Sequence, residues 1–456
     1  LHLSLRRQRQ MCIRDRGTLT DMQHRPYSKD ITLKFTATSG ISGGDSETVF
    51  DAVVDANGRG DYTTVQAAIN AAPANLTSPY LIFIAAGTYN ECVYIPKTKP
   101  FIHLIGENPD RVKIQFALNR VEEQTNSDTW PYSIHNPNSP ARLAGYTTDQ
   151  NCVVLIKATD VYLENISIIN LYGALKSRYD GGLGKGGQAE ALCSHYDRLA
   201  MNNCKLVSFQ DTWWTRFQKV NGTYGICRAY VQNSWIEGST DYIWGSGDVL
   251  IENSTFYNTG NGSFITASRS NETDAYGYVM KDCTIDGEAG ITAFSFGRQQ
   301  STSAKAVFIN TALKMDIIDG HWTAGSAAPA LFGEYNTVDK NNQVISTGDM
   351  TVGSGSSQFT AKVLSADEAA GYTYENIIAR EGWNPKQYMQ TPGTTMATLD
   401  GTTLSWNAID GAAGYLIFVN GVYLAQTTET SVSVTTAADG VYTVRGVGHY
   451  GSISAE

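Results

Sequence analysis

Two aspartates stand at matching places in two short, similar segments of the chain. The first segment begins at Asn203 and reaches Asp211 eight residues later, and the second begins at Asn233 and reaches Asp241 after the same interval. If the segments are successive turns of a solenoid, equivalent positions stack about 4.8 Å apart, the spacing of adjacent strands. Two carboxylates that close do not both ionise readily, so one holds a proton while the other stays anionic. The pattern predicts a general acid beside a nucleophile or base.

Amide side chains accompany the two aspartates. Gln210 directly precedes Asp211, and a glycine-rich stretch, LYGALKSRYDGGLGKGGQAEAL, leads into Gln188 without the G-x-x-x-x-G-K-[ST] pattern of a phosphate loop. Hydrolysis of an ester needs a nucleophile, a proton for the departing alcohol and donors for the developing oxyanion. Carboxylates and amides supply these groups. The alternative is that both aspartates only satisfy the backbone of turns, as aspartate often does.

A repeated motif indicates which elements position these groups. Five anchors, each followed by a short strand-like run, are 38, 30, 20 and 29 residues apart: Asn165, Asn203, Asn233, Asn253 and Asp282. Irregular periods in this range are typical of one supersecondary unit repeated with insertions on one face, whereas a sandwich does not repeat in this way. We therefore predict an all-β chain whose main domain is a right-handed parallel β-helix.

The segments around the repeat complete the predicted architecture. Apolar residues at helical spacing from Val65 to Ala72 predict a short helix that caps the first coil. Residues 119–150 are polar and form a predicted excursion that lines a binding cleft. After a linker around residues 385–395, alternating apolar strands predict a small C-terminal β-sandwich. The expected division is a non-native or disordered segment, a β-helix domain and the sandwich, at 1–45, 46–388 and 389–456.

The composition limits the classes of function. The chain has 456 residues, 17% charged residues and a net charge of −10, which argues against nucleic-acid binding. No apolar run is long enough to span a membrane or to form a signal-peptide core. Seven cysteines without a C-x-x-C pair predict neither a zinc site nor a complete disulfide framework, so we expect no metal and no cofactor. A monomer that is secreted or periplasmic is the expectation.

At the aspartates the sequence resembles the pectin methylesterases, or pectinesterases. Gln210-Asp211-Thr212 and Asp241-Tyr242-Ile243-Trp244-Gly245 resemble the family motifs Gln-Asp-Thr and Asp-Phe-Ile-Phe-Gly. The resemblance extends from about Phe50 to Trp383, with further motifs in the family's order at residues 87–91, 188–192, 296–300 and 331–336. Gln299 and Gln300 stand where the family pattern has Pro and Trp, so one sugar-stacking aromatic is missing.

The resemblance implies a role for each candidate. Asp241 is the nucleophile, Asp211 the acid and then the base, Gln188 and Gln210 the oxyanion donors, and Arg298 the partner that keeps Asp241 ionised. The implied reaction removes methyl esters from the galacturonate units of pectin, methyl-esterified homogalacturonan, giving pectate and methanol without a metal. Tryptophans beside polar catalytic candidates favour stacking on sugar rings over a place in the core. The predicted substrate-binding residues are Trp214, Trp244, Tyr242, Thr240 and Gln300.

Other interpretations remain open from the sequence alone. Arg298 also fits a surface ion pair, and Gln188 also fits an ordinary loop residue. The whole chain also fits a polysaccharide-binding protein that has lost activity, an esterase with altered ester specificity, or a pectate lyase, which needs a calcium cluster of several carboxylates. The last 60 residues or so resemble a short fibronectin type III domain at Leu404-Ser405-Trp406, Gly414-Tyr415 and Asn420-Gly421, suited to tethering or spacing the enzyme or binding carbohydrate.

Overall fold

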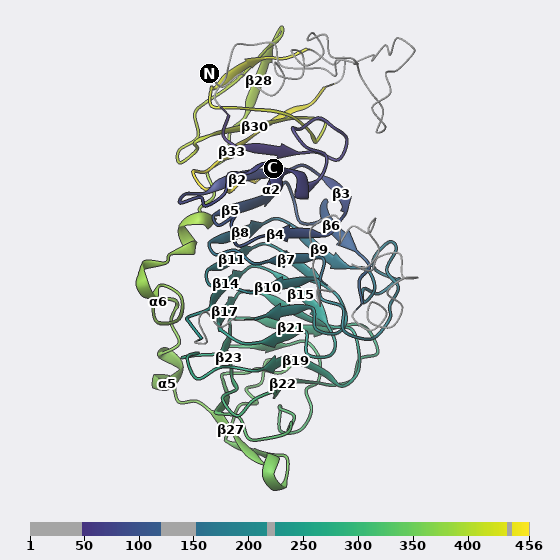
Figure 1. Ribbon diagram of the computed structural model, residues 1–456, viewed down its shortest axis with the longest axis vertical. Helices are drawn as coiled ribbons and strands as arrows, with labels where there is room; N and C mark the ends of the chain where they lie inside the picture. The colour runs from purple at the N-terminus through teal and green to yellow at the C-terminus, as the bar shows by residue number, and fades with distance from the viewer. Residues whose placement is uncertain (1–47, 120–151, 217–223, 436–439, 456) are drawn as a thin grey trace, which may run out of the picture.

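Three long sheets wind around a common core. The computed structural model describes residues 48–119, 152–216, 224–435 and 440–455, so the N-terminal 45 residues and positions 120–150 of the predicted excursion lie outside the described residues. Figure 1 shows the strands stacked in layers along the long axis of the molecule. In the described ranges, every pairing within the three sheets is parallel except that of β26 with β27. The prediction of a parallel β-helix is confirmed.

The three sheets contain twelve, seven and eight strands. In spatial order the first holds β1 (Ala52–Val54), β2 (Tyr80–Ile84), β5 (Ile102–Gly106), β8 (Val161–Glu164), β11 (Leu199–Asn202), β14 (Arg228–Gln232), β17 (Asp248–Glu252), β20 (Tyr278–Lys281), β23 (Lys305–Ile309), β25 (Leu331–Tyr335), β27 (Phe359–Val363) and β26 (Met350–Val352). The second holds β22 (Phe294–Gln299), β19 (Ser263–Ser268), β16 (Ile243–Gly245), β13 (Trp213–Thr215), β10 (Leu192–Ser194), β7 (Val154–Ile156) and β4 (Val93–Ile95). The third holds β24 (Ala312–Leu313), β21 (Thr284–Gly287), β18 (Thr255–Asn258), β15 (Trp235–Gly238), β12 (Lys205–Val207), β9 (Ser167–Asn170), β6 (Val112–Phe116) and β3 (Gly87–Asn90).

The anchors of the sequence repeat mark one corner of the β-helix. Each asparagine follows a strand of the twelve-stranded sheet with a φ between 48° and 57°, at Asn165, Asn203, Asn233 and Asn253. Asparagine tolerates this left-handed conformation better than most residues. The side chains also bond along the stack, since Asn203 Nδ2 donates to Asn165 Oδ1 at 2.7 Å. The repeat is therefore visible in the sequence because every coil makes the same turn.

A short helix joins the inner core at the first coils, as predicted. Helix α2 (Val65–Ala71) begins after Thr64, whose hydroxyl accepts a hydrogen bond from the backbone of Ala67. The Glu91 carboxylate also accepts bonds from the first two helical amides, at 2.8 and 3.0 Å. The buried face of α2 packs with the inward side chains of β1 and β2. The outward side of the same strands is also apolar, so a second cover is needed.

The C-terminal part of the chain supplies that cover. After β27, the elements η1 (Gly355–Ser357), α5 (Ala366–Ala370), α6 (Tyr374–Ile377), η2 (Arg380–Gly382) and η3 (Pro385–Met389) include a segment that returns along the twelve-stranded sheet, green in Figure 1. Ile377 and Trp383 of this segment pack in one cluster with the outward side chains of Tyr230 and Leu250. The predicted linker is thus partly structured, because η3 buries Tyr388 and Met389.

The last residues form the predicted small β-sandwich. Its two antiparallel sheets are β28 (Ala397–Asp400), β29 (Thr403–Trp406) and β32 (Ser431–Ser433), and β31 (Val422–Thr427), β30 (Gly414–Val419) and β33 (Tyr442–Val447). They share a core that includes Leu404 and Ile417. Figure 1 places the sandwich at the N-terminal end of the β-helix, and Phe418 packs in one cluster with Phe50 and Phe83. None of the helices in the described ranges is long and apolar enough to cross a membrane.

Candidate active site

Asp211 and Asp241 occupy equivalent corners of neighbouring coils. The pairing of β13 with β16 aligns Trp213 with Ile243, which places the two aspartates side by side two residues earlier. Both have a positive φ, 61° and 51°, and the Asp211 amide donates to the carbonyl oxygen of Thr240 at 3.0 Å. Both are also buried, with 2% and 5% of their surfaces exposed. The left-handed turn alone accounts for Asp or Asn here, so the case for chemistry depends on what the carboxylates contact.

Arg298 makes a two-pronged contact with Asp241. Its Nε donates to Asp241 Oδ1 at 2.9 Å and its Nη2 donates to Oδ2 at 2.5 Å. Arg298 lies on β22, in line with Ala267 on β19 and Trp244 on β16, so the small side chain of Ala267 separates the arginine from the tryptophan. The hydrogen bond to Asp241 raises the pKa of Arg298. A charge-assisted pair of this geometry favours the anionic form of Asp241.

The amide candidates line up beside the aspartates. Single-residue parallel bridges join Gln188 to Gln210 and Gln210 to Thr240, so the three residues occupy successive coils. All three are half-buried. The Gln188 carbonyl oxygen also accepts a bond from Asn119 Nδ2 at 3.3 Å. The structure therefore brings two primary amides and two carboxylates to one corner of the β-helix.

Two tryptophans lie on the outward column of the seven-stranded sheet. The rings of Trp214 and Trp244 stack with centroids 4.6 Å apart and an interplanar angle of 9°, and both side chains are half-buried. The guanidinium of Arg216 lies 5.1 Å from the Trp214 ring centroid. His195 touches the edge of the same ring, and burial lowers its pKa to about 3, helped by Arg216. A histidine that weakly basic is unsuited to proton transfer near neutral pH.

The prediction that Tyr242 binds substrate is wrong. Its side chain is 0% exposed and lies in the inner core, where its hydroxyl donates to Asn258 Oδ1 at 3.3 Å. The turn at Asp241 sends the next side chain inward, and Gly238 leaves room for it: a Cβ at Gly238 would meet Tyr242 Cβ at 2.3 Å. Thr240 remains half-buried and Gln300 is exposed, so both remain available to a ligand.

Two residues near the site were missed from the sequence. Phe264 lies in line with Asp241 on the following coil, and the Arg298 guanidinium is 4.9 Å from its ring centroid. Ala267 separates Arg298 from Trp244, as described above. An irregular coil length hides both, because the repeat spacing changes from 30 to 20 residues at this point. Counting residues from Asp241 therefore does not reveal which positions align on the next strand.

The comparison with known families decides what kind of protein carries this corner. A model of the pectinesterase family matches residues 51–136 and 139–381. The chain belongs to the pectinesterase family. A probable pectinesterase A of Neosartorya fischeri is 27% identical over 338 residues, which cover 73% of this chain and 88% of that protein. Pectinesterase 31 of Arabidopsis thaliana is 28% identical over 288 residues, covering 62% of this chain and 80% of the relative.

Solved structures of pectin methylesterases share the fold. The carrot pectin methylesterase superimposes with a TM-score of 0.56 at 22% identity and covers 75% of this chain and 97% of its own. A pectin methylesterase in complex with a hexasaccharide has a TM-score of 0.55 at 23% identity, covering 74% and 99%. The matched region contains every catalytic candidate named above. As a pectinesterase, the protein is a carboxylic ester hydrolase that removes methyl esters from pectin.

Proposed function

We propose that the corner formed by Asp211 and Asp241 is the catalytic site for methyl ester hydrolysis. The observation that carries this proposal is the two-pronged contact of Arg298 with one aspartate of a stacked pair. An arginine that stabilises one carboxylate as an anion leaves the neighbouring carboxylate to carry the proton. Asp241 is then suited to attack and Asp211 to donate a proton. A pair of turn residues needs no such asymmetry.

The proposed reaction proceeds in two halves. In the first, an Asp241 carboxylate oxygen attacks the ester carbonyl carbon, and the amides of Gln188 and Gln210 donate to the oxyanion that forms. Asp211 gives its proton to the methoxy oxygen, so methanol leaves and the galacturonyl group remains bonded to Asp241. In the second half, Asp211 takes a proton from water, which attacks the same carbonyl carbon. Asp241 leaves as a carboxylate, the galacturonate is released, and Asp211 is protonated again.

The proposed substrate is a methyl-esterified homogalacturonan chain rather than a small ester. The stacked Trp214 and Trp244 offer aromatic surface beside the two carboxylates, which suits a sugar face. The related structure bound to a hexasaccharide supports a site that accepts several sugar units. Thr240 and Gln300 are the polar residues that we propose contact the same chain.

Methanol release distinguishes this proposal from its rivals. We expect the full chain to release methanol from highly methylated pectin without forming an unsaturated product. Pectin binding without methanol would instead favour a binding protein, and an unsaturated product would favour a lyase. The described residues contain no group of three His, Cys, Asp or Glu side chains placed to hold a metal ion, whereas a lyase needs a calcium cluster.

Gln300→Trp is expected to strengthen substrate binding. Gln300 is exposed and only two residues beyond Arg298, so an indole there gains an additional stacking platform next to the site. One such aromatic contact contributes about 0.5 to 1.5 kcal/mol beyond area burial. The Michaelis constant on methylated pectin should therefore fall while kcat changes little. Gln299→Trp is an unsuitable comparison because Gln299 is buried and accepts a bond from the Gly325 amide at 2.9 Å. An unchanged Michaelis constant would mean that no sugar ring reaches position 300.

We also propose a fibronectin type III-like identity for residues 389–456. The two three-stranded sheets and their shared core support it. Because Phe418 packs with Phe50 and Phe83, the domain is suited to covering the first coils rather than to acting as a free tether. A polysaccharide substrate outside the cell favours a secreted or periplasmic enzyme, and we expect it to act as a monomer.

A further inference from the structure

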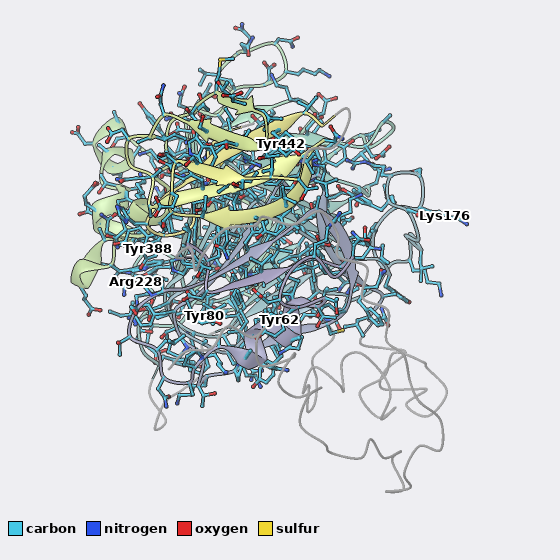
Figure 2. All side chains as sticks on the ribbon, turned by 90° about the horizontal axis from the view of Figure 1, so that it is seen from above. Tyr62, Tyr80, Lys176, Arg228, Tyr388 and Tyr442 are labelled. Atoms are coloured by element: carbon cyan, nitrogen blue, oxygen red, sulfur yellow. The ribbon has the colours of Figure 1, made fainter. Side chains whose placement is uncertain are left out.

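The loop that delivers Gln188 leaves the β-helix at the end of β9 and closes on itself. The Leu183 amide donates to the Leu171 carbonyl at 2.7 Å, and the Lys185 amide donates to the Tyr172 carbonyl at 3.0 Å. Figure 2 shows Lys176 of this loop at the rim of the molecule, on the other side from Arg228. Gln188 follows shortly after the last of these bonds. The position of the loop therefore sets where Gln188 enters the candidate site.

One buried carboxylate on the β-helix holds the loop in place. Glu237, on β15, is 0% exposed. Its Oε2 accepts three hydrogen bonds, from the Tyr179 hydroxyl at 2.8 Å, from Arg178 Nη1 at 3.0 Å and from Trp235 Nε1 at 3.1 Å. The first two donors belong to the loop. Burial raises the pKa of Glu237, and the ion pair with Arg178 opposes that change. A carboxylate this buried is costly without partners, so the fold requires the loop to cover it.

The arginine of this contact is itself tightly held. The Arg178 guanidinium lies 4.3 Å from the Tyr257 ring centroid and 5.7 Å from that of Trp235. These two rings stack on each other with centroids 4.7 Å apart. A weaker contact joins Arg178 to Glu288 at 3.8 Å. Cation–π contacts and the buried partner distinguish this pair from an ordinary surface ion pair.

The backbone of Glu237 also connects to both aspartates. Its carbonyl oxygen accepts a bond from Thr212 Oγ1 at 2.8 Å, and Thr212 directly follows Asp211. Further along the same chain segment, β15 leads into the turn that holds Asp241. Glu237 therefore joins the Gln188 loop, through its side chain, to the two coils that carry the carboxylates.

We propose that Glu237, through Arg178 and Tyr179, is a positioning residue that fixes Gln188 for the esterase reaction. This inference rests on the proposed function, in which the Gln188 amide stabilises the oxyanion. Glu237 itself is buried beneath the loop and acts on the reaction only through the loop. An oxyanion donor must be placed accurately relative to the transition state, so loosening the loop should affect the chemical step more than substrate binding.

Glu237→Gln tests this role because it keeps the side-chain shape and removes the charge. We expect kcat for methanol release to fall about tenfold to a hundredfold, as for a small misplacement of a catalytic group, with the Michaelis constant within about a factor of two. Tyr179→Phe removes one bond and should give a smaller loss of the same kind. Glu288→Gln is the matched control, since it removes the other carboxylate facing Arg178, and should leave kcat unchanged.

A double-variant comparison separates positioning from general destabilisation. In a Gln188→Ala background, Glu237→Gln should lower kcat no further, because the group it positions is already gone. Losses that multiply would overturn the inference, as would a lowered melting temperature with unchanged kcat well below it. If Glu237→Gln does not fold, the same comparison with Tyr179→Phe decides. A wild-type chain that releases no methanol contradicts the proposed function instead, whereas an active wild type with a fully active Glu237→Gln contradicts only this inference.

Discussion

Asp241→Asn is expected to lower kcat on methylated pectin by about four orders of magnitude, the scale seen when a nucleophile is removed. An amide oxygen is a far weaker nucleophile than a carboxylate, and the charge that attracts Arg298 is lost. The fold should survive, because asparagine tolerates the φ of 51° at this corner. The side chain of Arg298 is 34% exposed, so it remains partly hydrated when its partner is neutral. Initial rates of methanol release and a thermal melt measure both effects.

The chain offers a matched control at another corner. Asp282 also has a positive φ, 56°, but its Oδ1 accepts a bond from the neighbouring Asn310 and it lies in the asparagine stack. Asp282→Asn therefore makes the same chemical change at a turn without an arginine partner, and activity should remain at the wild-type level. Equal, near-native turnover in both variants would make Asp241 a turn residue and remove the proposed mechanism.

The corners of the β-helix were predictable because their demands are local. A left-handed residue after each strand selects asparagine or aspartate, and this selection repeats along the sequence whatever the length of the intervening loops. The equal offsets to Asp211 and Asp241 were informative for the same reason: β12 and β15 lead into the next corner over equal lengths. Their adjacency follows from counting residues.

Features that depend on distant packing were not predictable. Strand β2, Tyr80–Ile84, is apolar at almost every position, which indicates burial on both faces but not what covers the outer one. The structure shows that the sandwich covers it, through residues such as Phe418 that lie more than three hundred positions away. The inward direction of Tyr242 and the contact of Arg178 with Glu237 likewise depend on how separate segments meet.

Asp211→Asn is expected to lower kcat on the methyl ester about 10²- to 10⁴-fold, the usual contribution of a general acid or base. The loss has two parts in the proposed mechanism, because Asp211 first protonates the leaving methoxide and later deprotonates water. An ester with a more acidic alcohol separates them. Trifluoroethanol leaves readily without a proton, so attack by Asp241 on a trifluoroethyl-esterified galacturonate oligomer should need little help from Asp211.

With that substrate, the variant should acylate quickly and deacylate slowly. We expect a burst of trifluoroethanol, close to one equivalent per enzyme, followed by slow turnover, since water still lacks its base. Rapid quenching measures the burst, and intact-protein mass spectrometry detects the galacturonyl group retained on Asp241. Asp241→Asn is the control and should give neither burst nor adduct. If Asp211→Asn loses the same factor on both esters and accumulates no adduct, Asp211 does not protonate the leaving group, and the acid must be another residue of this corner.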